Sequence, residues 1–130
     1  MVKEKKRKVN NRKIRRKWES LGRFAATTDE KRAAYDRRLA ALWNVPFRLH
    51  FRHIPWPVFH HLPSKDDITD ERVALFFKIC MDEGEYKKQL RYWHPDKFMP
   101  MILKHVVKVH QEDVGQAAYR VSQILLNMWK

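Results

Sequence analysis

The sequence predicts an all-α protein, and three observations support this prediction. Glycine is scarce, with 3 in 130 residues, and long runs of helix-forming residues dominate the chain. Apolar residues recur within these runs at spacings of three and four, as on one face of a helix. Hydrophobic residues make up 44% of the chain, which is enough for a modest core. We therefore expect one small helical domain and a tail.

The net charge of +13 comes mainly from the N-terminus. Residues 1–17 contain ten basic residues and one acid, Glu4, whereas residues 44–130 carry a net charge of +3. Residues 1–28 are expected to form a basic arm, disordered or helical, whose weak helical period is interrupted at Gly22. Such an arm attracts import receptors, phosphate or acidic surfaces, or merely solubilises the chain. Import is favoured and phosphate binding comes next, through Lys5, Lys6, Arg7, Lys8, Arg12, Lys13, Arg15, Arg16 and Lys17.

Several classes of function lack their sequence signals. Cys80 is the only cysteine, so no intramolecular disulfide can form, and the histidine spacings do not favour a zinc site. No catalytic motif, phosphate-binding glycine loop or paired carboxylates stand out, so we predict neither an enzyme nor a cofactor. No apolar stretch has the length of a membrane span or follows the basic start as in a secretory signal. We therefore expect a soluble intracellular protein without a membrane partner.

Residues 29–65 are expected to form an amphipathic helix and then a connector. Thr27 and Glu30 have the spacing of a capping box, which predicts the start of the helix. Asn44 and Pro46 predict its end. The apolar face of this helix consists of Tyr35, Leu39, Leu42 and Trp43.

The connector is predicted to be irregular because it contains Pro55 and Pro57, each of which pushes the preceding residue into an extended conformation. Trp56 stands between these prolines and has little conformational freedom to lose, so we expect it to anchor the connector on the core. A short extended stretch is predicted from the alternation of Phe47, Leu49 and Phe51.

Residues 66–130 are predicted to form the helical domain. Its first helix is expected to begin near Thr69 or Asp70 and to stop at Gly84. The buried face of this helix is predicted to contain Val73, Phe76, Phe77 and Cys80.

Three further helices are expected. The segment "EYKKQLRYW" predicts a short basic helix with Tyr86, Leu90 and Trp93 on one face, and Pro95 ends it. Pro100 is expected in the first turn of the next helix, whose apolar side would hold Ile102, Val106 and Val109. The last helix is predicted to start near Glu112, with an apolar face of Val114, Ala117, Ala118, Val121, Ile124, Leu125 and Met128.

The segment "YKKQLRYWHPDK" contains the tripeptide His94-Pro95-Asp96, which taken alone is an ordinary turn that stops a helix. With its flanks, the segment resembles the second helix and loop of J-domains, the cochaperones of DnaK-type heat-shock chaperones. The segment "AAYRVSQILLNMW" is similar to the J-domain helix that packs antiparallel on that second helix. The matching residues are Tyr86, Lys87, Lys88, Trp93, His94, Pro95, Asp96 and Lys97.

The J-domain resemblance implies a small J-domain-like helical domain preceded by a basic helical arm. In that family the His-Pro-Asp loop docks on the ATPase domain of the chaperone and stimulates ATP hydrolysis, while a basic helix face contacts an acidic surface. The resemblance therefore implies that His94, Pro95 and Asp96 would trigger hydrolysis. The basic residues that would contact the chaperone are Lys87, Lys88, Arg91 and Lys97.

Residues 30–130 also resemble the C-terminal region of NF-kappa-B inhibitor-like proteins, most specifically in "IPWP" and "WHPDKF". Those are nuclear proteins implicated in transcriptional and innate-immune regulation and in RNA splicing. The ankyrin repeats of the animal proteins have no counterpart in this chain. The resemblance implies a protein-interaction module located in the nucleus, with the cytoplasm as a second location.

Two hypotheses of different kinds follow. In the first, the chain is a J-domain cochaperone that stimulates a DnaK-type chaperone. In the second, it is a structural subunit of a nuclear assembly for RNA processing or transcription regulation, whose arm binds RNA, phosphate or acidic protein surfaces. In that case the His94-Pro95-Asp96 segment is a turn that stabilises the fold.

Overall fold

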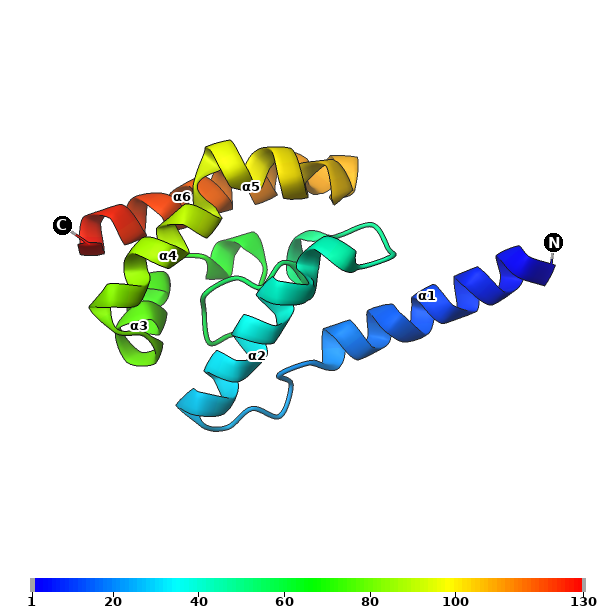
Figure 1. Cartoon of the computed structure of the whole chain (residues 1–130), viewed down its shortest axis with the longest axis horizontal. Coiled ribbons are helices and arrows are strands. Elements are labelled where there is room, and N and C mark those ends of the chain that lie inside the picture. The colour runs from blue at the N-terminus through cyan, green and yellow to red at the C-terminus, as the bar shows by residue number, and fades with distance from the viewer. Residues whose placement is uncertain (1, 130) are drawn as a thin grey trace.

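A computed structural model describes the backbone of residues 2–129 and the side chains of residues 11–129. This part of the chain contains six α-helices and no β-strand, which confirms the all-α prediction (Figure 1). Short 3₁₀ turns and irregular segments join the helices. The helices are α1 (Val2–Ser20), α2 (Thr28–Ala41), α3 (Asp70–Cys80), α4 (Glu83–Trp93), α5 (Pro95–Ile102) and α6 (Gln111–Trp129).

Helix α6 is the central packing element of the C-terminal half. It runs antiparallel to α4 and α5 (Figure 1), so that Lys87 near the start of α4 lies 5.6 Å from the ring of Trp129 at the end of α6. Near the other end of α6, Gly115 leaves room for Met99 of α5, because a Cβ atom at this position would lie 3.0 Å from the Met99 methyl group. The predicted apolar face of α6 is confirmed by the buried residues Val114, Ala117, Ala118, Val121, Ile124 and Leu125.

The predicted start of α2 is confirmed by its N-cap. The Thr27 hydroxyl accepts a hydrogen bond from the Glu30 amide at 3.1 Å, which satisfies one of the free N–H groups of the first turn. Thr69 caps α3 in the same way, through a 3.2 Å bond from the Arg72 amide. Local side-chain chemistry therefore decides where both helices begin.

The connector between α2 and α3 is irregular, as predicted, and it crosses the core. Leu49 forms a single parallel bridge with Val106: the Leu49 amide donates to the His105 carbonyl, and the Val107 amide donates to the Leu49 carbonyl, both at 2.8 Å. Trp56 is only 4% exposed, which confirms its role as a packing anchor.

Four aromatic rings form a stacked column through the middle of the molecule. The ring of Phe51 stacks on Trp56 with centroids 4.8 Å apart, and Trp56 stacks on Trp93 at 5.4 Å. Trp93 in turn stacks on Phe98 at 5.1 Å. The column joins the connector to the end of α4 and the start of α5, so these segments are held together by buried aromatic surface.

The arm is helical, and its C-terminal end contacts the body (Figure 1). The Trp18 indole N–H donates to the His53 carbonyl at 2.9 Å. The Glu19 carboxylate lies 2.8 Å from Nε2 of His53 and accepts a bond from Arg52 at 3.1 Å. Gly22, with φ of +80°, then turns the chain toward α2, as the predicted interruption requires.

The predicted stop of α3 at Gly84 is wrong. Helix α3 ends at Cys80 because Met81 is extended, and Asp82 and Glu85 then form a capping box that starts α4. Gly84 lies in the first turn of α4, where the backbone N–H groups have no carbonyl partner within the helix. The N-cap at Asp82 starts a new helix before Gly84, so this glycine does not end α3.

The helix predicted from Pro100 is also wrong. The chain re-enters a helix earlier, at Pro95, and Pro100 lies inside α5. Helix α5 ends at Ile102, and two 3₁₀ turns lead to α6, so no single helical face runs on to Val109. Ile102 and Val106 are buried as expected, but Val109 is 83% exposed.

Candidate functional site

The candidate site is the junction of α4 and α5. His94 has φ of −59° and ψ of 133°, the extended conformation that a residue before proline prefers. Pro95 occupies the first position of α5, where its missing N–H costs no hydrogen bond. The amides of Lys97 and Phe98 donate to the His94 carbonyl at 3.0 and 2.8 Å. One residue thus separates the two helices, and the turn is fixed by its backbone.

The His94 ring caps α5. Its Nδ1 accepts a hydrogen bond from the Asp96 amide at 3.2 Å, which satisfies one of the free N–H groups of the first turn. Nδ1 is also 3.8 Å from Oδ2 of Asp96. The Asp96 side chain is 92% exposed, and among residues 11–129 no Lys or Arg forms a salt bridge with it. The junction therefore presents one free carboxylate beside an imidazole.

Buried aromatic residues flank the segment His94-Pro95-Asp96. Trp93 and Phe98, on either side of it, are both fully buried in the aromatic column. The Trp93 indole N–H donates to the Tyr35 hydroxyl at 3.1 Å, and that hydroxyl donates to Gln89 at 2.6 Å. Burial raises the pKa of Tyr35 well above its usual value, so the hydroxyl keeps the proton that it donates. Helix α2 thereby supports the end of α4 through a satisfied buried network.

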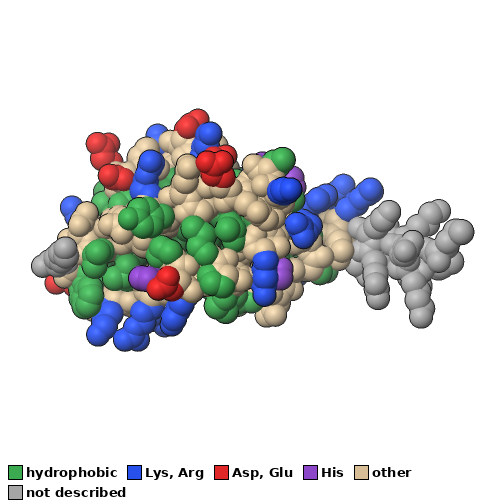
Figure 2. Space-filling view, turned by 90° about the horizontal axis from the view of Figure 1, so that it is seen from above, with side chains coloured by type: hydrophobic (Ala, Val, Ile, Leu, Met, Phe, Trp, Pro, Cys, Tyr) green, Lys and Arg blue, Asp and Glu red, His purple; other side chains and the backbone are tan. Residues whose placement is uncertain are grey.

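A shallow groove of about 340 Å³ lies beside the junction. Its floor is mainly apolar, and basic side chains surround it. Figure 2, seen from above α5 and α6, shows hydrophobic side chains gathered on this face and Lys and Arg side chains along one edge. The groove is lined by Lys87, Leu90, Arg91, His94, Asp96, Lys97 and Trp129.

Most of the predicted chaperone-binding residues meet at this groove. Lys88 is exposed on α4 but lies outside the lining, and Pro95 contributes through the backbone turn. Trp129 was not predicted, although it is 48% exposed and forms a cation–π contact with Lys87. The sequence feature that could have identified it is its place, one position beyond the predicted apolar face of the last helix. A large exposed aromatic side chain beside charged residues is typical of interaction surfaces.

The basic arm forms a second cationic surface. The arm points away from the helical body (Figure 1), and within residues 11–20 its basic side chains form no salt bridge. The predicted residues Lys5, Lys6, Arg7 and Lys8 have side chains outside the described part. Arg15 is partly buried, and the exposed basic residues are Arg12, Lys13, Arg16 and Lys17.

Three of the histidines cluster near the arm. The ring centroid of His50 lies 5.3 Å from that of His53 and 5.1 Å from that of His110. The Nδ1 atoms of His53 and His110 accept backbone N–H groups at 2.9 and 3.0 Å. Burial lowers the pKa of His53 to about 4, so its ring is neutral at pH 7. Among the described side chains, no group of three or more His, Cys, Asp or Glu residues is arranged to hold a metal ion.

Between residues 2 and 129, every helix is too short or too polar to cross a lipid bilayer. Comparison with known proteins found no matching family model, curated protein or solved structure. The two resemblances drawn from the motifs therefore remain predictions.

Proposed function

We propose that this protein is a nuclear protein-interaction module that docks on a DnaK-type chaperone through the α4–α5 junction and stimulates ATP hydrolysis by that chaperone. The observation that carries the proposal is the Asp96 carboxylate, 92% exposed and without a Lys or Arg partner among the described side chains. It is held in the first turn of α5 above the buried rings of Trp93 and Phe98.

The position of Asp96 suits a docking group. The first turn of a helix favours a negative charge, because the free N–H groups there carry partial positive charge. An exposed carboxylate can accept two parallel hydrogen bonds from an arginine of a partner. The hydrogen bonds of the turn at His94 and Pro95 already fix the backbone at Asp96, so little backbone conformational entropy is lost on binding.

The basic side chains around the groove suit an acidic partner surface. Lys87, Arg91 and Lys97 all line the groove next to Asp96. Charges of one sign around a docking surface accelerate the encounter with a surface of the opposite sign and favour one orientation. The proposal therefore assigns triggering to His94, Pro95 and Asp96 and steering to the surrounding basic residues, as the J-domain resemblance implies.

The test is single-turnover ATP hydrolysis by a DnaK-type chaperone, measured with the wild-type protein and with Asp96→Asn. Asp70→Asn is the matched control, because Asp70 is an exposed aspartate in the first turn of α3, outside the groove. We expect acceleration by the wild type and by Asp70→Asn, and loss of acceleration in Asp96→Asn with unchanged circular dichroism. Full acceleration by Asp96→Asn, or none by the wild type, would overturn the proposal.

The second candidate function is a structural subunit of a nuclear RNA-processing or transcription-regulating assembly. The supporting observation is the helical arm, whose exposed cations form no salt bridge within residues 11–20 and are free for phosphates or acidic side chains. Nuclear import through Lys5, Lys6, Arg7 and Lys8 belongs to the same proposal. Loss of nuclear accumulation of a fluorescent fusion after removal of residues 1–17 would support import, and unchanged accumulation would contradict it.

A further inference from the structure

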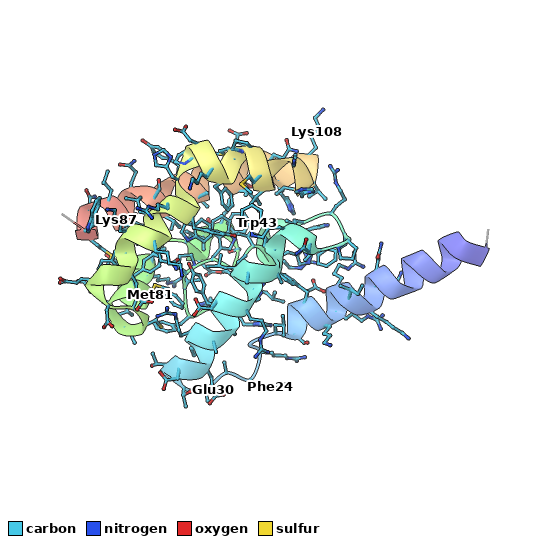
Figure 3. All side chains as sticks on the ribbon, viewed as in Figure 1. Phe24, Glu30, Trp43, Met81, Lys87 and Lys108 are labelled. Atoms are coloured by element: carbon cyan, nitrogen blue, oxygen red, sulfur yellow. The ribbon has the colours of Figure 1, made fainter. Side chains whose placement is uncertain are left out.

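A small cavity lies between the loop after α1, helix α2 and the connector, in a part of the fold separate from the α4–α5 junction. Phe24, labelled in Figure 3, belongs to the loop on one side of it. The cavity holds about 80 Å³ and is half enclosed, with Trp56 and Phe76 among its apolar walls. This is well below the roughly 300 Å³ of ordinary small-molecule pockets, so the cavity has room for one small group.

All the charged side chains that line this cavity are basic. Arg23 comes from the loop, and Lys31 and Arg38 come from α2. His61 also lines it, and burial together with the neighbouring charges of Arg38, Arg23 and Lys31 lowers the pKa of His61. The acid Glu19 lies nearby, but it is not part of the lining and is already bonded to His53 and Arg52.

Arg38 is the central group. It is only 8% exposed, its Nη2 donates to the His53 carbonyl at 3.2 Å, and its guanidinium lies 5.4 Å from the ring centroid of Trp18. Its Nε–H is buried and has no acceptor. Burial without a bound carboxylate lowers the pKa of Arg38 to about 10. Arg38 is therefore a buried guanidinium that lines the cavity and, among residues 11–129, forms no salt bridge with a carboxylate.

We propose that this cavity binds a terminal phosphate group, either inorganic phosphate or the phosphate of a monoester. Such a group carries a charge of about −1.5 to −2 at pH 7 and three acceptor oxygens, which complement the three cations that line the cavity. The apolar walls strengthen the attraction because they exclude water. An internal phosphate of a nucleic acid is excluded, since it carries sugars on two sides and the cavity admits only one small group.

The test uses the full chain and inorganic phosphate as the probe, with binding followed by isothermal titration calorimetry in chloride buffer at constant ionic strength. Lys31→Met removes a cation from the lining, and Lys78→Met makes the same change at an exposed position of α3 outside the cavity. We expect one site per chain, a Kd raised about tenfold by Lys31→Met, equivalent to about 1.4 kcal/mol, and a Kd unchanged by Lys78→Met.

Two further measurements complete the test. Arg38→Met is expected to remove binding, but because the change could also destabilise the fold, Lys31→Met decides the outcome. Titration with O-phospho-L-serine distinguishes the sources of the phosphate: equal or tighter binding identifies an esterified ligand, and binding of inorganic phosphate alone identifies the free anion. Absence of a saturable site in the wild type, or equal weakening by Lys31→Met and Lys78→Met, would overturn the proposal.

Discussion

The indole ring of Trp56 stacks on that of Trp93, with centroids 5.4 Å apart and 20° between the ring planes. The first residue belongs to "IPWP" and the second to "WHPDKF", the two segments that carry the resemblance to NF-kappa-B inhibitor-like proteins. The rigid proline-flanked tryptophan of the connector therefore supports the residue that comes just before the His94-Pro95-Asp96 turn. The irregular connector is part of the structure that positions the candidate site.

Trp56→Ala is expected to destabilise the protein by about 3–5 kcal/mol, because it leaves a cavity in the aromatic column. Urea denaturation followed by circular dichroism measures the change. Trp129→Ala, at a tryptophan that is 48% exposed, should change the free energy of unfolding by less than about 0.5 kcal/mol. Equal effects of the two substitutions would contradict the central role of the column.

Trp129→Ala is expected to weaken binding to the chaperone about tenfold without a change in stability, if the groove is the docking surface. The indole supplies apolar area beside Lys87 and Asp96, and aromatic residues dominate the binding energy of interfaces. Surface plasmon resonance with an immobilised DnaK-type chaperone measures the affinity. Tyr119→Ala, at another exposed aromatic residue of α6, is the control and should bind as the wild type does. Unchanged affinity in Trp129→Ala would place the contact elsewhere.

Stability is expected to fall as the pH drops from about 6.5 to about 4. Burial lowers the pKa of His53 from 6.5 to about 4, so between these values the unfolded chain binds a proton that the folded chain does not. The stabilisation is complete above pH 6.5 and is lost progressively below it, with a slope that approaches about 1.4 kcal/mol per pH unit. Urea midpoints at a series of pH values measure the slope.

Two histidine substitutions test this dependence, one at the buried His53 and one at an exposed histidine. His53→Gln should reduce the slope between pH 4 and pH 6.5, although it also lowers stability overall because the ring is fully buried. Part of the slope should remain, because burial also lowers the pKa of His50 and of His61. His105→Gln, at an exposed position, should keep the wild-type slope. A slope that is unchanged in His53→Gln would contradict the role of His53.

Replacement of Arg12, Lys13, Arg16 and Lys17 by Gln is expected to weaken binding of single-stranded RNA and to reduce its salt dependence, if the arm binds phosphates. Each phosphate contact on single strands contributes about −0.7 to the slope of log K against log salt, so four lost contacts change the slope by about 3. Fluorescence anisotropy between about 50 and 200 mM salt measures it. The double variant of exposed Lys104 and Lys108 to Gln should leave the slope unchanged, whereas an equal change in both variants would exclude a specific role of the arm.

The helical class, and the features that depend on neighbouring residues, could be predicted from the sequence. The N-caps at Thr27 and Thr69 and the break at Pro95 arise from hydrogen bonds and sterics within one turn, so they could be predicted without the fold. The apolar face of α6 was predictable because its period of 3.6 residues spans the whole helix. The end of α3 and the start of α5 were misplaced because glycine and proline signals compete with caps a few residues away.

The contacts between residues that are distant in the sequence depend on how the helices pack, and they could not be predicted. Trp129 joins His94 at one groove because α6 runs antiparallel to α4, and no local signal encodes that contact. Arg38 is one of several cations in the sequence of α2, yet the connector and the end of α1 bury it beside Lys31. Burial and the neighbourhood of a charge depend on how whole elements pack, and the periodicity of a single element does not contain that information.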